Sequence, residues 1–115
     1  MILDIKAILN DETIINLEMQ VINFNDWTER SLSYLCRCFD NLGRGHGYLH
    51  VKGAVHIGFL DYTLFPDYPE FYATYRMINE RTGQLYSSKF RISVVDLTKR
   101  NLATKEDISH HRDLW

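Results

Sequence analysis

Two apolar segments at the start of the chain flank a polar turn signal. Residues 2–9 and 13–22 are rich in Ile, Leu and Val, and Asn10-Asp11-Glu12 lies between them. Successive side chains on a strand point to opposite faces, so the alternating pattern predicts a β-hairpin. A turn at 10–12 pairs residue i with residue 22 − i, which places Asp4 directly opposite Glu18. Like charges directly opposite each other destabilise a sheet unless something binds between them, so this pair is the first candidate site.

The two faces of this hairpin differ in character. One face is wholly apolar, and we expect it to be the buried face; its members are Leu3, Ile5, Ala7, Ile15, Leu17, Met19 and Val21. The opposite face is polar and carries Asp4, Lys6, Asn16, Glu18 and Gln20.

A helix is predicted next, over residues 26–42. Asp26 and Glu29 have the spacing of a capping box, and apolar side chains then recur at helical spacing up to residue 42. Gly43 is a stop signal, and residues 43–47 are expected to form a loop. The run 54–60 is short and mostly apolar, as in a central strand.

The second half of the chain is predicted to be mainly β-structure. Residues 71–79 and 85–87 flank a turn at 80–84 and predict a hairpin, and residues 90–97 predict a last strand. A strand, helix and strand in sequence form a plausible right-handed βαβ crossover. We therefore expect an α/β domain with a mixed β-sheet over residues 1–100. A polar tail or short helix follows over 101–115.

Composition limits the class of protein. The chain has 115 residues, with 13 Lys and Arg against 15 Asp and Glu, which suits one domain with an ordinary charge balance. We expect no contact with a membrane, because no apolar run is long enough to span one. Two cysteines build no disulfide framework, so a cytoplasmic location is expected. The faint acidity argues against coating of nucleic acid by bulk charge, but not against an enzyme that gathers carboxylates in one site.

Two carboxylates and an amide on one strand face suit a hard divalent cation. Mg²⁺ prefers one or two carboxylates, completed by water and phosphate oxygens. Asp4, Glu18 and Gln20 supply these groups, and the Met19 carbonyl offers a further oxygen ligand. Such an ion polarises a phosphoryl group and lowers the pKa of a bound water. The plain alternative is a solvated polar strand face, and the spacing alone does not decide between the two.

An ordered string of segments resembles the PD-(D/E)XK nuclease superfamily, and more closely the bacterial PD-(D/E)XK nuclease family transposases. The likeness covers roughly residues 2–100. The segments that carry it are Leu3-Asp4-Ile5-Lys6, Ile15-Asn16-Leu17-Glu18-Met19-Gln20, Arg30-Ser31-Leu32-Ser33-Tyr34, Tyr48-Leu49, Leu64-Phe65-Pro66-Asp67 and Thr82-Gly83.

The resemblance implies a metal-dependent DNA endonuclease with a restriction-endonuclease-like core. Asp4 and Glu18 would be ligands of Mg²⁺ or Mn²⁺, and Gln20 takes the position more often held by lysine. Gln20 is neutral, so it can orient a water or a phosphate but cannot shuttle a proton. Met1 lies three residues before Asp4. The core is therefore expected to lack its first helix, and the chain to be truncated at the N-terminus and in its C-terminal region.

Arg30 and Tyr34 on the predicted helix are candidates for contact with the substrate phosphates. Arg30 lies one turn from the helix start and near the end of the preceding strand, whereas Arg37 is better explained as part of a solvated face. His56 is expected to be a partly buried core histidine.

A second function class also stays open, namely an inactive, truncated remnant with a binding role. Missing elements would leave part of the apolar hairpin face uncovered, and exposed apolar patches favour self-association, for example as a homodimer.

Overall fold

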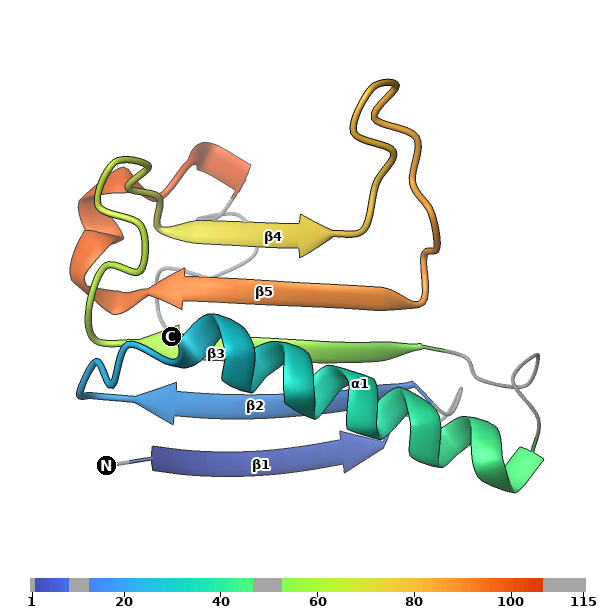
Figure 1. Ribbon diagram of the computed structural model, residues 1–115. Coiled ribbons are helices and arrows are strands. Elements are labelled where there is room, and N and C mark those ends of the chain that lie inside the picture. The colour runs from blue at the N-terminus through green and yellow to red at the C-terminus, as the bar shows by residue number, and fades with distance from the viewer. Residues whose placement is uncertain (1, 9–12, 47–52, 107–115) are drawn as a thin grey trace.

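The computed structural model describes residues 2–8, 13–46 and 53–106, and they form a five-stranded mixed sheet with one long helix (Figure 1). The strand order is β1-β2-β3-β5-β4; β3 is parallel to both β2 and β5, and the two edge strands are antiparallel to their neighbours. The elements are β1 (Ile2–Ile8), β2 (Ile14–Gln20), α1 (Trp27–His46), β3 (Ala54–Leu60), β4 (Tyr72–Arg76), β5 (Phe90–Asp96) and the 3₁₀ helix η2 (Leu97–Leu102). This is the predicted mixed-sheet α/β fold with a β2-α1-β3 crossover.

The β1–β2 hairpin has the predicted register. Asp4 pairs with Glu18 and Ile2 with Gln20, as a turn at 10–12 requires. That turn itself lies outside the described residues. The pairing fixes the backbone positions of the two acidic residues directly across from each other.

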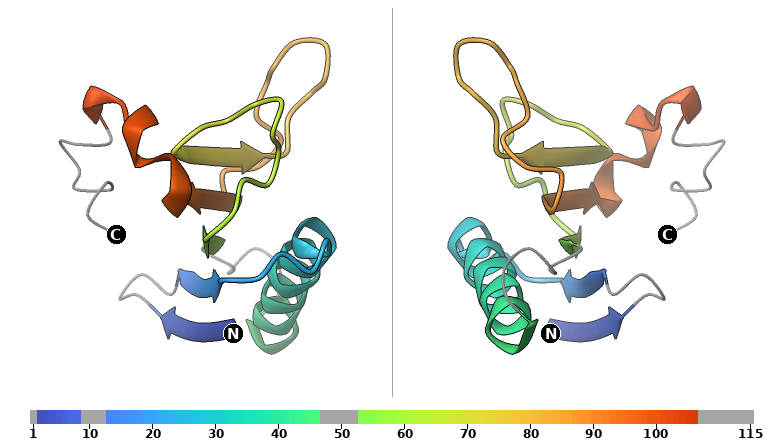
Figure 2. Two further views of the ribbon diagram at one scale, coloured as in Figure 1. Left: turned by 90° about the vertical axis from the view of Figure 1, so that its left-hand side faces the viewer. Right: turned by 90° about the vertical axis from the view of Figure 1, so that its right-hand side faces the viewer.

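Helix α1 covers one face of the sheet, whereas η2 lies on the other side (Figure 2). The backbone N–H of Arg30 donates to the carbonyl of Asp26 at 2.9 Å, so the helix begins directly after Asp26, as predicted. The prediction that Gly43 ends the helix is wrong, because α1 continues to His46. A glycine in a helix costs only about 1 kcal/mol relative to alanine, so an established helix can continue through it. The segment Tyr48-Leu49 lies outside the described residues.

The expectation for the buried face of the hairpin is also wrong. In β2 the even-numbered residues Ile14, Asn16, Glu18 and Gln20 are buried, while the odd-numbered residues are half-buried. Ile5 is 50% exposed and Val21 is 44% exposed, although both belong to the apolar face. Alternation sorts side chains onto two faces, but the helix decides which face is covered, and α1 lies on the face that carries Glu18.

The apolar core under α1 explains why this face of the hairpin is the buried one. Its buried apolar residues are Trp27, Leu35, Ala54, Leu60, Ile92 and Val94. The indole of Trp27 lies over Gly58, where an added Cβ would approach the ring to 2.3 Å. Glycine at position 58 therefore admits the first turn of α1 onto β3, next to the polar residues of β2.

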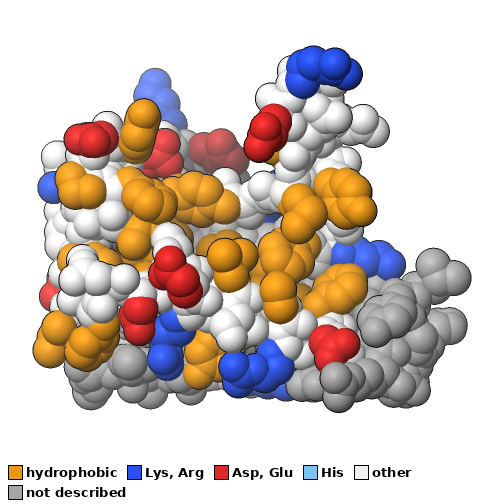
Figure 3. Space-filling model, in the orientation of Figure 1, with side chains coloured by type: hydrophobic (Ala, Val, Ile, Leu, Met, Phe, Trp, Pro, Cys, Tyr) orange, Lys and Arg blue, Asp and Glu red, His pale blue; other side chains and the backbone are white. Residues whose placement is uncertain are grey.

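An apolar groove runs between α1 and the β4–β5 part of the sheet, where Figure 3 shows a band of apolar side chains. Its volume is about 150 Å³, and it is lined in part by Trp27, Leu32, Phe65 and Tyr75. The rings of Phe65 and Tyr75 meet edge to face, with centroids 6.2 Å apart.

A hairpin arm formed by residues 77–86 projects from the end of β4 (Figure 1). It holds one isolated bridge, between Ile78 and Leu85, so the second strand predicted at 85–87 is reduced to that bridge. The reason is that β4 pairs with β5 instead. After β5 the side chain of Asp96 caps η2 by accepting from the N–H of Thr98 at 2.9 Å. Residues 107–115 lie outside the described residues. Among the described residues, no helix is long and apolar enough to cross a membrane.

Candidate active site

Glu18 on β2 has a fully buried carboxylate, and the guanidinium of Arg30 on α1 contacts it. The Nε of Arg30 donates to Oε1 of Glu18. An unpaired charge at such a depth would be very costly, and the guanidinium supplies the partner that a buried carboxylate needs. Because the helix begins directly after Asp26, Arg30 lies near its start, and its side chain reaches Glu18 on β2. The two residues therefore form one unit although they belong to different elements.

His56 on β3 approaches the same carboxylate from the other side. Its Nε2 lies 3.4 Å from Oε2 of Glu18, and its Nδ1 lies 3.0 Å from Nδ2 of Asn16. An amide NH₂ donates, so Nδ1 accepts and the proton of neutral His56 sits on Nε2, facing Glu18. The His56 ring packs against Trp27 and stacks on Tyr34, with centroid distances of 5.2 and 5.6 Å.

His56 was predicted to be a partly buried core residue, and its place beside Glu18 was not foreseen. It is fully buried. The feature that reveals this place is the parallel pairing of β2 with β3, in which Asn16 is the register partner of His56, 40 residues later in the chain. That pairing places His56 on the strand next to the one that carries Glu18.

Gln20 is buried two residues beyond Glu18 on the same face. Its Oε1 accepts a hydrogen bond of 2.7 Å from the hydroxyl of Tyr62, and its Nε2 has no hydrogen-bond partner among the described residues. Burial, followed by the negative charges of Asp26 and Glu18, raises the pKa of Tyr62 to about 12. The hydroxyl therefore stays protonated and donates to Gln20, which leaves the amide NH₂ of Gln20 with its donors unused.

A family model described as PD-(D/E)XK nuclease family transposase matches residues 1–115, the whole chain. The chain belongs to this family. No curated protein and no solved structure matches it significantly. The mixed sheet with one main helix is consistent with a PD-(D/E)XK nuclease-like core. PD-(D/E)XK nucleases generally use divalent metals, and membership of a nuclease transposase family implies DNA as the substrate.

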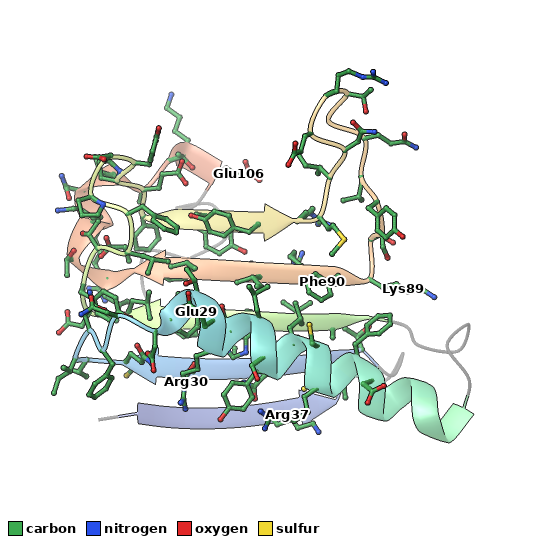
Figure 4. The ribbon with its side chains drawn as sticks, viewed as in Figure 1. Glu29, Arg30, Arg37, Lys89, Phe90 and Glu106 are labelled. Atoms are coloured by element: carbon green, nitrogen blue, oxygen red, sulfur yellow. The ribbon has the colours of Figure 1, made fainter. Side chains whose placement is uncertain are left out.

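A polar pocket opens beside the ion pair of this PD-(D/E)XK domain. It has a volume of about 350 Å³ and is lined by Asp26, Glu29, Arg30, Ser33, Tyr34 and Arg37. The guanidinium carbons of Arg30 and Arg37 lie 5.3 and 5.5 Å from the ring centroid of Tyr34. Figure 4 shows both arginines on the side of α1 nearest β1. The helix thus presents two cations around one aromatic ring at the mouth of the pocket.

The metal ligands predicted for a PD-(D/E)XK nuclease fit in type. Glu18 supplies carboxylate oxygens, and the backbone of Asp4 lies directly opposite; the Asp4 side chain is outside the described part. One or two carboxylates are what Mg²⁺ takes from proteins. In the part of the chain that the structure describes, no group of three or more His, Cys, Asp or Glu side chains is arranged to hold a metal.

Proposed function

We propose that this chain is a metal-dependent endonuclease domain that hydrolyses phosphodiester bonds in DNA during transposition or recombination. The observation that carries the proposal is the register pair of Asp4 and Glu18 in a chain of this family. Two acidic residues opposite each other on adjacent strands are destabilising unless a cation lies between them. The neighbouring pocket with Arg30 and Arg37 suits the phosphates of a substrate.

Asp4, Glu18 and the Met19 carbonyl would hold Mg²⁺ or Mn²⁺. When bound, the ion supplies Lewis acidity at the phosphoryl oxygen and makes a nearby water more acidic. Gln20 would orient the attacking water or a phosphate oxygen through its Nε2 donors, which have no partner among the described residues. Being neutral, it contributes position and no charge.

Arg30 and Tyr34 would contact the scissile strand from the helix. In the described arrangement Arg30 donates to the Glu18 carboxylate. A metal ion that takes over the charge of Glu18 would compete with this guanidinium. Arg30 is 28% exposed and borders the pocket, so it can turn toward a phosphate once the metal pairs with Glu18.

Nicking of supercoiled plasmid tests the proposal, with Mg²⁺, with Mn²⁺ and with chelator. We expect cleavage only with a metal, and loss of cleavage in Asp4→Asn and in Glu18→Gln, both of which keep side-chain shape. Asp67→Asn, on an exposed loop, is the matched control and should cleave like the wild type. Equal cleavage by all four proteins, with folding confirmed by circular dichroism, would contradict the assignment.

A second function is favoured by one observation, the exposure of apolar residues on the hairpin face away from α1. Ile5 and Val21 are 50% and 44% exposed. A binding role that includes self-association into a homodimer would cover them. Light scattering after size exclusion separates the two proposals. A dimer that dissociates in Ile5→Lys and lacks metal-dependent nicking supports the binding role, and a monomer that nicks supports the nuclease.

A further inference from the structure

Two arginines lie directly opposite each other where β4 meets β5. Arg76 is the register partner of Arg91, and the preceding same-face pair is Thr74 with Ser93. Ile92 and Val94 alternate with these positions and belong to the core under α1. The arginine pair therefore lies on the face of the sheet turned away from α1, and so away from Glu18.

This pair has no carboxylate to neutralise it among the described residues. Neither Arg76 nor Arg91 forms an ion pair there. Like charges directly across two strands are destabilising, as for the acidic pair of the first hairpin. The Nε of Arg91 is shielded from solvent and has no hydrogen-bond partner in this part of the chain. A buried donor without an acceptor is costly, and an anion that accepts from the guanidinium would relieve that cost.

The surroundings of the pair are cationic and rich in hydroxyls. Lys89 lies two residues before Arg91 and points out beyond the end of the sheet (Figure 4). The hydroxyl of Thr74 lies 3.4 Å from that of Ser93, which also accepts from the Tyr72 hydroxyl at 3.2 Å. The cluster of Arg76, Lys89 and Arg91, here called the far-face cluster, thus continues into polar side chains along the same two strands.

From this geometry we infer that the far-face cluster is a second phosphate-binding site. It would contact the DNA backbone at a distance from the scissile bond. The guanidinium forks of Arg76 and Arg91 match phosphate oxygens bidentately. The identity of the anion as DNA rests on the proposed function, whereas the site itself rests on the arginine pair. The site is sequence-independent, since phosphate contacts position a duplex and do not read its bases.

Fluorescence anisotropy with a labelled duplex, in chelator to prevent cleavage, measures the contribution of this site. A protein that loses Z phosphate contacts loses about 0.9Z from the slope of log affinity against log salt. For Arg76→Gln/Arg91→Gln we expect a slope smaller by about 2. The affinity should fall by about eightfold per contact at roughly 0.1 M salt. Arg76→Lys/Arg91→Lys keeps the charge without the fork and should recover part of the loss.

Lys105→Gln is the matched control, because it removes an exposed positive charge outside the far-face cluster. It should leave the slope nearly unchanged. An equal loss in Lys105→Gln, or an unchanged slope in the double glutamine variant with an unchanged melting temperature, would overturn the inference. A titration with inorganic phosphate separates the sources. Phosphate binding that is lost in the double variant, with duplex affinity unaffected, would mark a small-anion site and also overturn the DNA assignment.

The two proposals fail separately. If the wild type does not nick but its duplex binding depends on Arg76 and Arg91, the nuclease proposal falls and the far-face cluster stands. If the double glutamine variant binds like the wild type while Glu18→Gln abolishes nicking, the reverse holds.

Discussion

Arg30 donates a hydrogen bond from the first turns of α1 to the carboxylate of Glu18, which has no exposed surface. This contact joins the helix to the second strand through a charge that the sheet would not otherwise tolerate. Coulombic attraction and the loss of hydration act in opposite directions in such a pair. The consequence is a strong dependence of each residue on the other.

Removal of Arg30 alone should destabilise the domain. We expect Arg30→Gln to lower the free energy of unfolding by about 2–3 kcal/mol, because Glu18 is left buried without its cation; the partial exposure of Arg30 keeps the cost below that of a fully buried pair. Urea denaturation measures it. Arg37→Gln is the control, since Arg37 contacts only Ser33 and Tyr34 on the exposed helix face in the contacts described here, and it should cost less than about 0.5 kcal/mol. Adding Glu18→Gln to Arg30→Gln should restore much of the loss, and a purely additive double variant would contradict this account.

His56 should be neutral and carry its proton on Nε2. The donor of this arrangement is Asn16, whose amide nitrogen lies 3.0 Å from Nδ1. Long-range ¹⁵N correlations of the histidine ring identify the tautomer directly. Asn16→Leu leaves the buried Nδ1 without its donor and should cost about 1–3 kcal/mol. Detection of the Nδ1-protonated tautomer would show that the amide of Asn16 has the reverse orientation.

Gly58 should not accept even a methyl group. A Cβ there would lie 2.3 Å from the Trp27 ring, so Gly58→Ala should cost about 1–3 kcal/mol or more through displacement of the first turn of α1. Gly53→Ala is the matched control, because its nearest neighbour would be 3.7 Å away. Thermal unfolding compares them, and equal melting temperatures would contradict the close packing of Trp27 on β3.

Tyr62 should ionise later than an ordinary tyrosine. Burial, with the charges of Asp26 and Glu18, raises its pKa from 10.0 to about 12. The folded state thus keeps the proton that the unfolded state releases first. The stability contributed by Tyr62 is therefore full below pH 10 and is lost as the pH rises to about 12. The pH dependence of chemical denaturation should flatten in this window in Tyr62→Phe. An unchanged pH dependence would exclude Tyr62 as its source.

The extent to which sequence predicted this molecule differs between its parts. The register of Asp4 and Glu18 was predictable, because a short turn leaves few ways to pair two strands. The buried face was not, because alternation is symmetrical until a helix covers one side, and the pairing of Trp27 with Gly58 that seats α1 joins distant segments. His56 reaches Glu18 through a parallel pairing that no local pattern encodes.

The pairing of Arg30 with Glu18 also bears on how such a domain decays. In a copy that no longer cuts DNA, loss of either residue alone would still endanger the fold, because each offsets the burial or the charge of the other. Selection for an intact chain would then retain both for reasons unrelated to cleavage. In this chain, retention of Glu18 together with Arg30 is therefore not by itself a sign of activity, which only the Asp4–Glu18 pair indicates. A copy that had lost both Arg30 and Glu18 would lack the carboxylate proposed for cleavage and would no longer need either residue for its packing.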